Sequence, residues 1–344
     1  MHRCSPIVEK HLHDKHAKMK QDPFQFLRGT YYRWAQAWRE ICPECVAAPP
    51  VISVGDLHID SYGTWRDVEG RLCWGVDDFD EAYPLPYTND LIRLATSVKI
   101  ARKLTLLNLK TRDACDAILE GYKEGLREGG CPFVLAEEER HLEKLGIWAL
   151  KAATAFWEKI EGRPTFRGHL PGEARRPLEQ AFPDHNLKYR IIQREAGLGS
   201  LGQQRFVAVA LCRGGYIARE AKRVVPSASV WLDGRISCGQ HYYRKAMDCA
   251  VRSRDPYQKI SGPWLIRRLS PDSNPIEIEA LPAKRDEEVL LHAMGGEAAN
   301  VHLGEKGRAN AILKDLSSRK PGWLRVAAKK MTKQIVREWK EYRN

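Results

Sequence analysis

A run of three glycines between two predicted strands constrains the fold of this chain more than any other feature. Gly197, Gly199 and Gly202 have the spacing Gly-x-Gly-x-x-Gly. The segments 189–193 before the run and 205–211 after it are rich in residues that favour strands. A dinucleotide-binding turn would need a helix after the glycines, because the helix N-terminus holds the pyrophosphate. We therefore predict either a hairpin loop whose bare backbone lies over a phosphate, or merely a tight bulged hairpin.

The strand that follows this hairpin carries basic side chains suited to a phosphate site. After a turn at residues 213–215, the segment 216–222 is predicted to be a strand, and it contains Arg219 and Lys222. Either cation could contact the phosphates of a nucleotide, and a charged edge strand is the alternative. The residues predicted to bind the nucleotide are Gly197, Gly199, Ser200, Gly202, Arg219 and Lys222.

Two acidic clusters follow short predicted strands in the first quarter of the chain. Asp56 follows the strand 51–54, and four carboxylates lie among residues 77–81 after the strand 71–76. Carboxylates this crowded repel one another unless a cation or protons compensate. Oxygen ligands of this kind suit Mg²⁺ that bridges to a phosphate, whereas a solvated acidic loop is the simpler alternative.

The acidic clusters supply candidate catalytic and metal-binding residues. We expect Asp56 to orient or deprotonate an acceptor hydroxyl, with His58 beside it. His58 could instead only hydrogen-bond the loop backbone. The predicted Mg²⁺ ligands are Asp78, with Asp80, Asp77 or Ser61 helping.

Composition narrows the class of protein without fixing its function. The 344 residues carry a net charge of +12, which favours anionic partners such as nucleotides, nucleic acid or a membrane surface. No run approaches the ~20 apolar residues of a membrane span, and no apolar signal core follows the N-terminus. Nine scattered cysteines, with only Cys42 and Cys45 at ligand spacing, fit a reducing compartment. We expect a cytoplasmic protein with no membrane span.

The pattern along the chain predicts an α+β fold in which a strand-rich middle is flanked by helices. Asn89 or Asp90 is expected to cap a helix that continues to Ile100. The other predicted helices cover 1–48, 112–128, 137–160, 241–251 and 287 to the end, the strand-rich part covers 187–270, and 162–185 is a linker. The predicted domains are 1–165, 187–285 and 286–344.

Seven sequence blocks follow one another along the chain. They are 24–29 (FQFLRG), 55–58 (GDLH), 63–65 (GTW), 74–81 (WGVDDFDE), 90–95 (DLIRLA), 197–202 (GLGSLG) and 219–222 (REAK). Taken in order, they resemble the bacterial domain-of-unknown-function 2252 family. These blocks are similar in turn to those of aminoglycoside-phosphotransferase and protein-kinase enzymes, but in permuted order.

The resemblance implies a circularly permuted, kinase-like two-lobed fold with a small β-rich lobe, a large helical lobe, and ATP and Mg²⁺ as cofactors. The chain departs from the family pattern at Ser61 and Tyr62, where Asn-Phe is usual, and at Asp77, where Asn is usual. Both departures touch the expected metal site. Arg28 and Arg93, which belong to the family blocks, are expected to brace acidic loops through buried ion pairs.

The expected function is ATP- and Mg²⁺-dependent phosphotransfer to an unknown acceptor, or nucleotide binding with weak activity. A calcineurin-like metal-dependent phosphoesterase is an alternative, because 51–58 ends in Asp-x-His after a strand. Its further ligands would have to come from His185–Asn186 or Asn300–His302, which are poor candidates. A non-catalytic nucleic-acid-binding protein is a second alternative, based on the basic amphipathic stretch 320–343. We expect that stretch to pack on its own domain instead.

Overall fold

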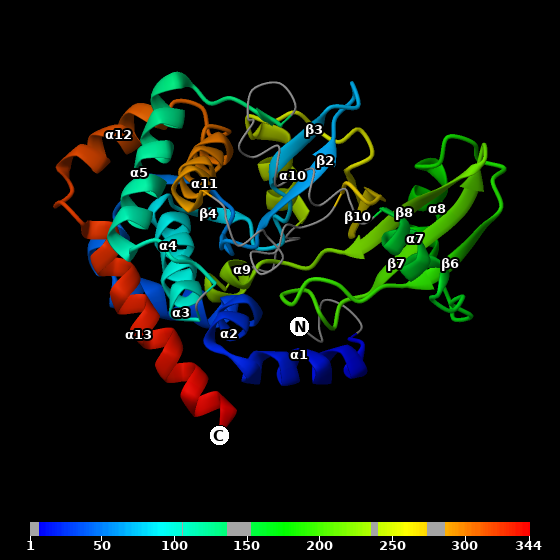
Figure 1. The fold of residues 1–344 in the computed structure, drawn as a ribbon, viewed down its shortest axis with the longest axis horizontal. Helices are drawn as coiled ribbons and strands as arrows, with labels where there is room; N and C mark the ends of the chain where they lie inside the picture. The colour runs from blue at the N-terminus through cyan, green and yellow to red at the C-terminus, as the bar shows by residue number, and fades with distance from the viewer. Residues whose placement is uncertain (1–6, 105, 136–152, 235–239, 274–285) are drawn as a thin grey trace.

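The computed structural model describes residues 7–104, 106–135, 153–234, 240–273 and 286–344 (Figure 1). The chain begins with helices α1 (Glu9–Gln21), α2 (Pro23–Gly29) and α3 (Tyr31–Ile41) and the short 3₁₀ turn Pro43–Cys45. Asp22 separates α1 from α2, because its side chain accepts hydrogen bonds from the amides of Phe24 (2.7 Å) and Gln25 (2.9 Å). Pro23 then occupies the first helical turn, where its missing N–H costs nothing.

The largest core is built mainly from helices, with some strand residues, and contains residues from the early and late parts of the chain. Its later helices are α4 (Thr88–Lys103), α5 (Thr111–Glu128), α11 (Glu287–His302), α12 (Ala309–Ser318) and α13 (Trp323–Arg343). Glycines bring α5 and α11 close together: a Cβ at Gly121 would lie 1.9 Å from His292 O, and one at Gly295 would lie 2.1 Å from Ile118 O. The two backbones therefore touch where larger residues would hold them apart.

Two small antiparallel sheets carry the acidic residues. Strand β1 (Pro50–Ser53) pairs with β4 (Tyr83–Pro86), while β2 (Tyr62–Arg66), β3 (Leu72–Val76) and the short β5 (Phe133–Val134) form the second sheet. The two strands predicted at 51–54 and 71–76 therefore exist but do not pair with each other. The loop 54–61 joins β1 to β2, and the loop 77–82 joins β3 to β4, so each loop connects one sheet to the other.

The glycine run joins two strands of a five-stranded antiparallel sheet in the order β6-β7-β8-β10-β9. The strands are β6 (Tyr189–Gln193), β7 (Arg205–Cys212), β8 (Gly215–Arg223), β9 (Lys259–Ser261) and β10 (Trp264–Leu269). Figure 1 shows this sheet extending away from the helical core, with α7 (Ala153–Glu161) and α8 (Gly172–Gln180) beside it. The predicted hairpin at the glycines is confirmed.

Two sequence predictions need correction, and a third lies mostly outside the described residues. The linker predicted over 162–185 contains α8, because Ala174 and Leu178 bury against the sheet and this packing outweighs the proline inside the helix. Helix α4 begins after Tyr87, so Asn89 and Asp90 lie inside its first turn. The helix predicted over 137–160 lies largely outside the described residues, which contain α7.

Among the described residues, two helices lie between β8 and β9 in the sequence. They are α9 (Ala228–Leu232) and α10 (Gln240–Cys249). Tyr243, Ala246 and Met247 of α10 pack in the large helical core, although they belong to the segment predicted as β-rich. The molecule is therefore an α+β protein. No helix within the described ranges is long and apolar enough to cross a membrane.

Candidate functional site

A cavity of about 560 Å³ lies between the five-stranded sheet and the two acidic loops. Residues that are far apart in the sequence line it, among them Asp56, Asp78, Gly199 and Lys222. We call residues 54–61 the first acidic loop and residues 77–81 the second acidic loop. The structure thus brings the glycine run, one predicted cation and both acidic clusters to the same cavity.

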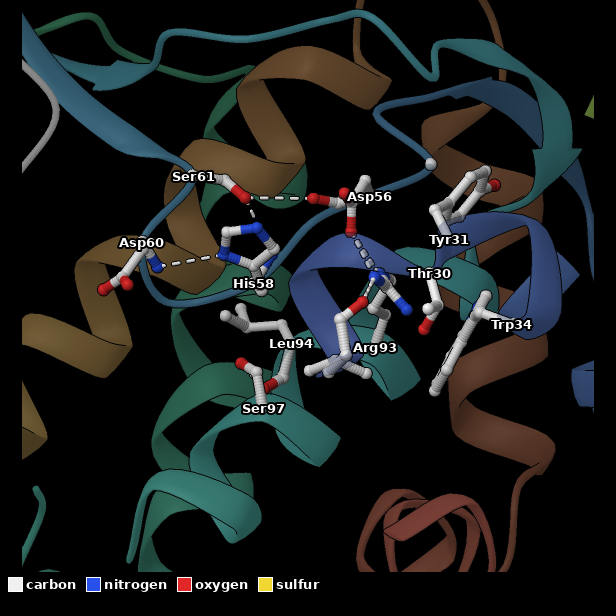
Figure 2. A network of polar contacts seen from close by, with 12 residues as sticks. Thr30, Tyr31, Trp34, Asp56, His58, Asp60, Ser61, Arg93, Leu94 and Ser97 are labelled. Carbon is white, nitrogen blue, oxygen red and sulfur yellow. Dashed lines mark hydrogen bonds and ion pairs between the residues drawn. The ribbon is translucent and has the colours of Figure 1, made fainter. Parts of the chain in front are cut away.

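Asp56 of the first acidic loop is held by a buried arginine of α4 (Figure 2). Arg93 donates from Nε (2.6 Å) and from Nη2 to Asp56 Oδ1, and it also donates to Leu27 O (2.9 Å). The guanidinium lies over the rings of Tyr31 and Trp34. Burial raises the pKa of Asp56 and the charge of Arg93 opposes that rise. One carboxylate oxygen is therefore fixed, and Oδ2 lies toward the glycine loop, since a Cβ at Gly199 would lie 3.9 Å from it.

His58 and Ser61 hold the first acidic loop in shape (Figure 2). Ser61 Oγ accepts a hydrogen bond from His58 N (2.9 Å) and donates one to Asp56 O (3.0 Å). His58 Nδ1 accepts from Asp60 N (3.2 Å). Burial, with the nearby charge of Arg28, lowers the pKa of His58 well below its ordinary value, so the ring is neutral and carries its proton on Nε2. These bonds match the simpler interpretation of His58 and occupy the hydroxyl that Ser61 would offer to a metal.

A second arginine braces the same loop. Arg28 Nη1 of α2 lies 2.9 Å from Asp60 Oδ2, which is almost fully buried. The sequence-based expectation that Arg28 and Arg93 brace an acidic loop through buried ion pairs is confirmed. Arg28 also lies over the ring of Phe24, which fixes the direction of its side chain.

In the second acidic loop, two carboxylates share one lysine. Lys222 Nζ lies 2.9 Å from Asp78 Oδ2 and 2.5 Å from Asp80 Oδ2, and the lysine side chain is 3% exposed. Burial acts to raise the pKa of Asp78, but the ion pair with Lys222 outweighs it and lowers the pKa to about 2. Burial and the charge of Asp78 raise the pKa of Asp80 to about 6.

The other two acids of this loop, like Asp80, have raised pKa values. Burial raises the pKa of Asp77 to about 6, against the nearby charge of Arg267. Burial likewise raises the pKa of Glu81 to about 8, although its Oε2 accepts a hydrogen bond from Ala228 N (2.7 Å) at the start of α9. Within the described residues, Asp78 and Asp80 thus share one lysine, while Asp77 and Glu81 have no ion pair of their own.

The sheet turns a basic face toward these carboxylates. We use this name for Arg194, Arg205, Lys222 and Arg267, all of which line the cavity. Arg205 lies opposite Lys222 in the strand pairing, and Arg267 lies opposite Glu220. Because Glu220 and Lys222 are two residues apart in β8, the side chains of both pairs share one face of the sheet. Buried Glu220 accepts from Arg194 (2.9 Å), Arg205 (3.1 Å) and Arg267 (2.7 Å). Its charge holds the three guanidinium groups together.

Three arginines of this face, Arg194, Arg205 and Arg267, were not predicted from the sequence, whereas Arg219, which was predicted to contact phosphates, lies elsewhere. Arg219 is three residues from Lys222, so strand alternation turns it to the opposite face. There it donates to Ala181 O (2.8 Å) and lies over Tyr257, away from the cavity-lining residues. The prediction that Arg219 contacts phosphates is corrected accordingly. Glu220 and Lys222 are two residues apart in a strand, and this alternation was the sequence signal that could have identified the basic face.

The glycines of the loop differ in what they require. Gly197 (φ +72°) and Gly202 (φ +98°) have left-handed backbones that other residues rarely adopt. Gly199 has no such backbone requirement, and its absent side chain would point toward Arg28 O (3.6 Å) and Asp56 Oδ2. Ser200 Oγ accepts from Arg205 Nη2 (2.9 Å), which ties the loop to the basic face. Gly199 therefore leaves open the space directly above Asp56.

The described residues contain no group of three or more His, Cys, Asp or Glu side chains arranged to hold a metal ion. The ligands that a phosphoesterase would need lie elsewhere. His302 is buried between Asp90 and Tyr122, and Asn300 hydrogen-bonds Cys131 and Glu297. His185 is exposed. The described residues of the cavity therefore do not supply the further metal ligands that a calcineurin-like phosphoesterase would need.

The basic C-terminal stretch forms α13, and its apolar face is buried. Leu324, Met331 and Ile335 are each at most 1% exposed and belong to the large core. The expectation that this stretch packs on its own domain is confirmed.

Comparison with known proteins adds one family match. The chain is similar over residues 7–143 to a family described as "Uncharacterized protein conserved in bacteria (DUF2252)". This segment contains both acidic loops and Arg93, whereas the sheet with the glycine loop lies beyond it. No curated protein matches, and no solved structure matches.

Proposed function

We propose that this protein is a kinase-like phosphotransferase that uses ATP and Mg²⁺, with its two lobes in permuted order. One observation carries the proposal: within a single cavity, a basic sheet face and a glycine loop lie opposite two acidic loops. A nucleotide with bound Mg²⁺ matches this arrangement, since phosphates need cations and bare amides while the metal needs carboxylates. The acceptor would be a hydroxyl-bearing molecule.

The residues present fit a magnesium ion that shares its ligands with phosphate. Mg²⁺ in such sites is usually held by one or two carboxylates, and phosphate oxygens and water complete its shell. Asp78 and Asp80 provide that pair, and Asp80 Oδ1 is buried without a hydrogen-bond partner among the described residues. Bound Mg²⁺ would neutralise charge on the phosphates. Lys222 would then leave the two carboxylates and pair with a phosphate.

The first acidic loop supports the proton transfer that such a reaction needs. The acceptor hydroxyl oxygen forms a bond to the γ-phosphorus, the bond from that phosphorus to the bridging oxygen of ADP breaks, and the hydroxyl proton passes to Asp56. Arg93 holds Oδ1 of Asp56, so Oδ2 is the oxygen available to the hydroxyl. Burial raises the pKa of Asp56 toward the range in which a carboxylate accepts a proton more readily.

The two departures from the family pattern lie at the proposed metal site. Ser61 uses its hydroxyl to brace the loop, and Asp77 adds a carboxylate whose pKa is already raised to about 6. A nucleotide-binding protein with weak turnover is the form of the proposal in which these changes matter most. Binding and turnover should therefore be measured separately.

The test combines calorimetric titration of ATP, with Mg²⁺ or with EDTA, and an assay for ADP release. We expect binding that requires Mg²⁺ and falls at least tenfold in Gly199→Val, whose side chain would fill the space above Asp56. Gly215→Val is the matched control, because a Cβ there meets nothing within 4 Å. Position 215 lies in the hairpin between β7 and β8, at the opposite end of β7 from the glycine loop. ADP release would identify an enzyme, and binding without release would identify the weakly active form. No binding of ATP by the folded wild-type protein would overturn the proposal.

A further inference from the structure

The N-terminal helix contacts the glycine loop along one face. Val8 N donates to Gly202 O (2.9 Å), and His11 Nε2 lies 2.9 Å from Glu195 Oε1. One turn further on, Lys15 Nζ donates to Gly199 O (2.8 Å). Val8 directly precedes α1, and positions 11 and 15 lie one turn apart on the same face of the helix, so the start of α1 and this face hold the loop at three points. Helix α1 is thus a wall of the cavity as well as a clamp on the loop.

Lys15 differs from the other cations of the cavity in its partners. Its residue is 7% exposed, yet none of the described carboxylates lies within ion-pair distance of its Nζ. By contrast, Arg28 pairs with Asp60, Lys222 with Asp78 and Asp80, and the three sheet arginines with Glu220. A buried charge without a counter-ion is costly. The ammonium group of Lys15 can therefore pair with an anion that enters the cavity.

The surroundings of Lys15 place that anion near Asp56. The loop residue to which it donates, Gly199, is the one whose missing side chain would approach Asp56 Oδ2. An ammonium has three N–H groups, and the structure gives Nζ one hydrogen bond within the described residues. Burial lowers the pKa of Lys15, and the charges of Glu81 and Asp56 oppose this only in part. An anion bound beside Lys15 would stabilise the charged form of its ammonium group.

We infer that Lys15 binds the phosphoryl group in transit, at the point where it passes from ADP to the acceptor held by Asp56. This inference rests on the proposed function and adds a residue from outside both the sheet and the acidic loops. The two free N–H groups of Lys15 would contact the equatorial oxygens of that group, where negative charge is spread during transfer. Lys222 and the sheet arginines would hold the phosphates that remain on ADP.

The experiment compares ADP·Mg²⁺ with ADP·Mg²⁺ plus aluminium fluoride, which mimics the phosphoryl group in transit. In Lys15→Met we expect the affinity for the fluoride complex to fall at least tenfold, while the affinity for ADP·Mg²⁺ changes less than twofold. Lys15→Arg, which keeps the charge, should retain most of the extra affinity. Lys18→Met, at an exposed position of the same helix, is the matched control.

The outcomes separate this inference from the proposed function. If wild-type protein binds ADP·Mg²⁺ and its fluoride complex, and Lys15→Met weakens both equally or neither, the assigned role of Lys15 is overturned. Equal weakening, together with faster amide exchange in residues 196–203, would make Lys15 only a clamp of the loop. If wild-type protein binds no nucleotide, the proposed function falls, and the role of Lys15 falls with it.

Discussion

The two acidic loops differ in how the protein compensates their charge. In the first acidic loop, Asp56 and Asp60 each have an arginine of their own, and Ser61 fixes the backbone between them. In the second acidic loop, Asp78 and Asp80 share a single lysine, and burial raises the pKa of Asp77 and of Glu81. Each of these two acids in the first loop thus has its own cation, whereas in the second loop two acids share one cation and Asp77 and Glu81 have no ion pair within the described residues.

Under the proposed function, this difference separates the loop that positions a hydroxyl from the loop that binds a cation. A carboxylate that must meet one hydroxyl benefits from a fixed orientation, and buried hydrogen-bonded pairs provide it. A carboxylate group that must receive a cation benefits from excess negative charge, because the cation then relieves repulsion. The contrast can be tested by removing the partners of each loop in turn.

The largest effect is expected from Arg93→Met. This change leaves Asp56 partly buried without its ion pair, a kind of loss that typically costs about 3–5 kcal/mol of the free energy of unfolding. Chemical denaturation measures it. Arg33→Met is the control, because the Arg33 side chain is 46% exposed in its pair with Glu338 and should change stability by less than about 1 kcal/mol. Equal losses in the two variants would show that the first loop is not specially supported.

An intermediate effect is expected for Glu81→Gln, and it depends on pH. Burial raises the pKa of Glu81 from 4.5 to about 8, so its protonated form stabilises the fold below about pH 4.5 and that contribution is lost as the pH rises through 8. Between pH 5 and pH 9 the wild-type free energy of unfolding should fall by up to about 4 kcal/mol more than that of Glu81→Gln, because each pKa unit corresponds to about 1.4 kcal/mol. Denaturation at pH 5 and pH 9 measures the difference.

The control for this pH dependence is Glu173→Gln, because the Glu173 side chain is exposed on α8. That variant should follow the wild-type pH dependence. If wild type and Glu81→Gln show the same pH dependence of the free energy of unfolding, burial does not raise the pKa of Glu81.

The smallest effect is expected from Ser61→Ala. The change removes one hydrogen bond to His58 N and one to Asp56 O, which together contribute about 1–2 kcal/mol. Stability should fall by that amount, and amide exchange should speed up in residues 56–61. Ser317→Ala, which removes an exposed hydroxyl bonded within its own helix, should leave stability nearly unchanged. An unaffected loop in Ser61→Ala would leave Ser61 available as a metal ligand.

Local patterns predicted the parts of the site but not all of its contacts. The spacing of Gly197, Gly199 and Gly202 between two strand patterns gave the hairpin, because those backbone demands are local. Arg219 and Lys222 lie three residues apart in one strand, and the pattern alone could not say which of them faces the acids. Lys15 was missed altogether, since a lysine in a polar N-terminal helix carries no sign of the loop carbonyl it contacts 184 residues later.

The sequence by itself determined the α+β class, the hairpin at the glycines, the loops that carry the carboxylates, and the use of Arg28 and Arg93 as braces. All of these follow from short-range backbone preferences or from residues that recur in motifs. Only the tertiary structure decided which cations meet which acids: that Lys222 lies between Asp78 and Asp80, and that Glu220 gathers three arginines. It also decided that α1 brings Lys15 to the carbonyl of Gly199. Electrostatic partners are chosen by distance in space, and burial decides how much each pairing is worth.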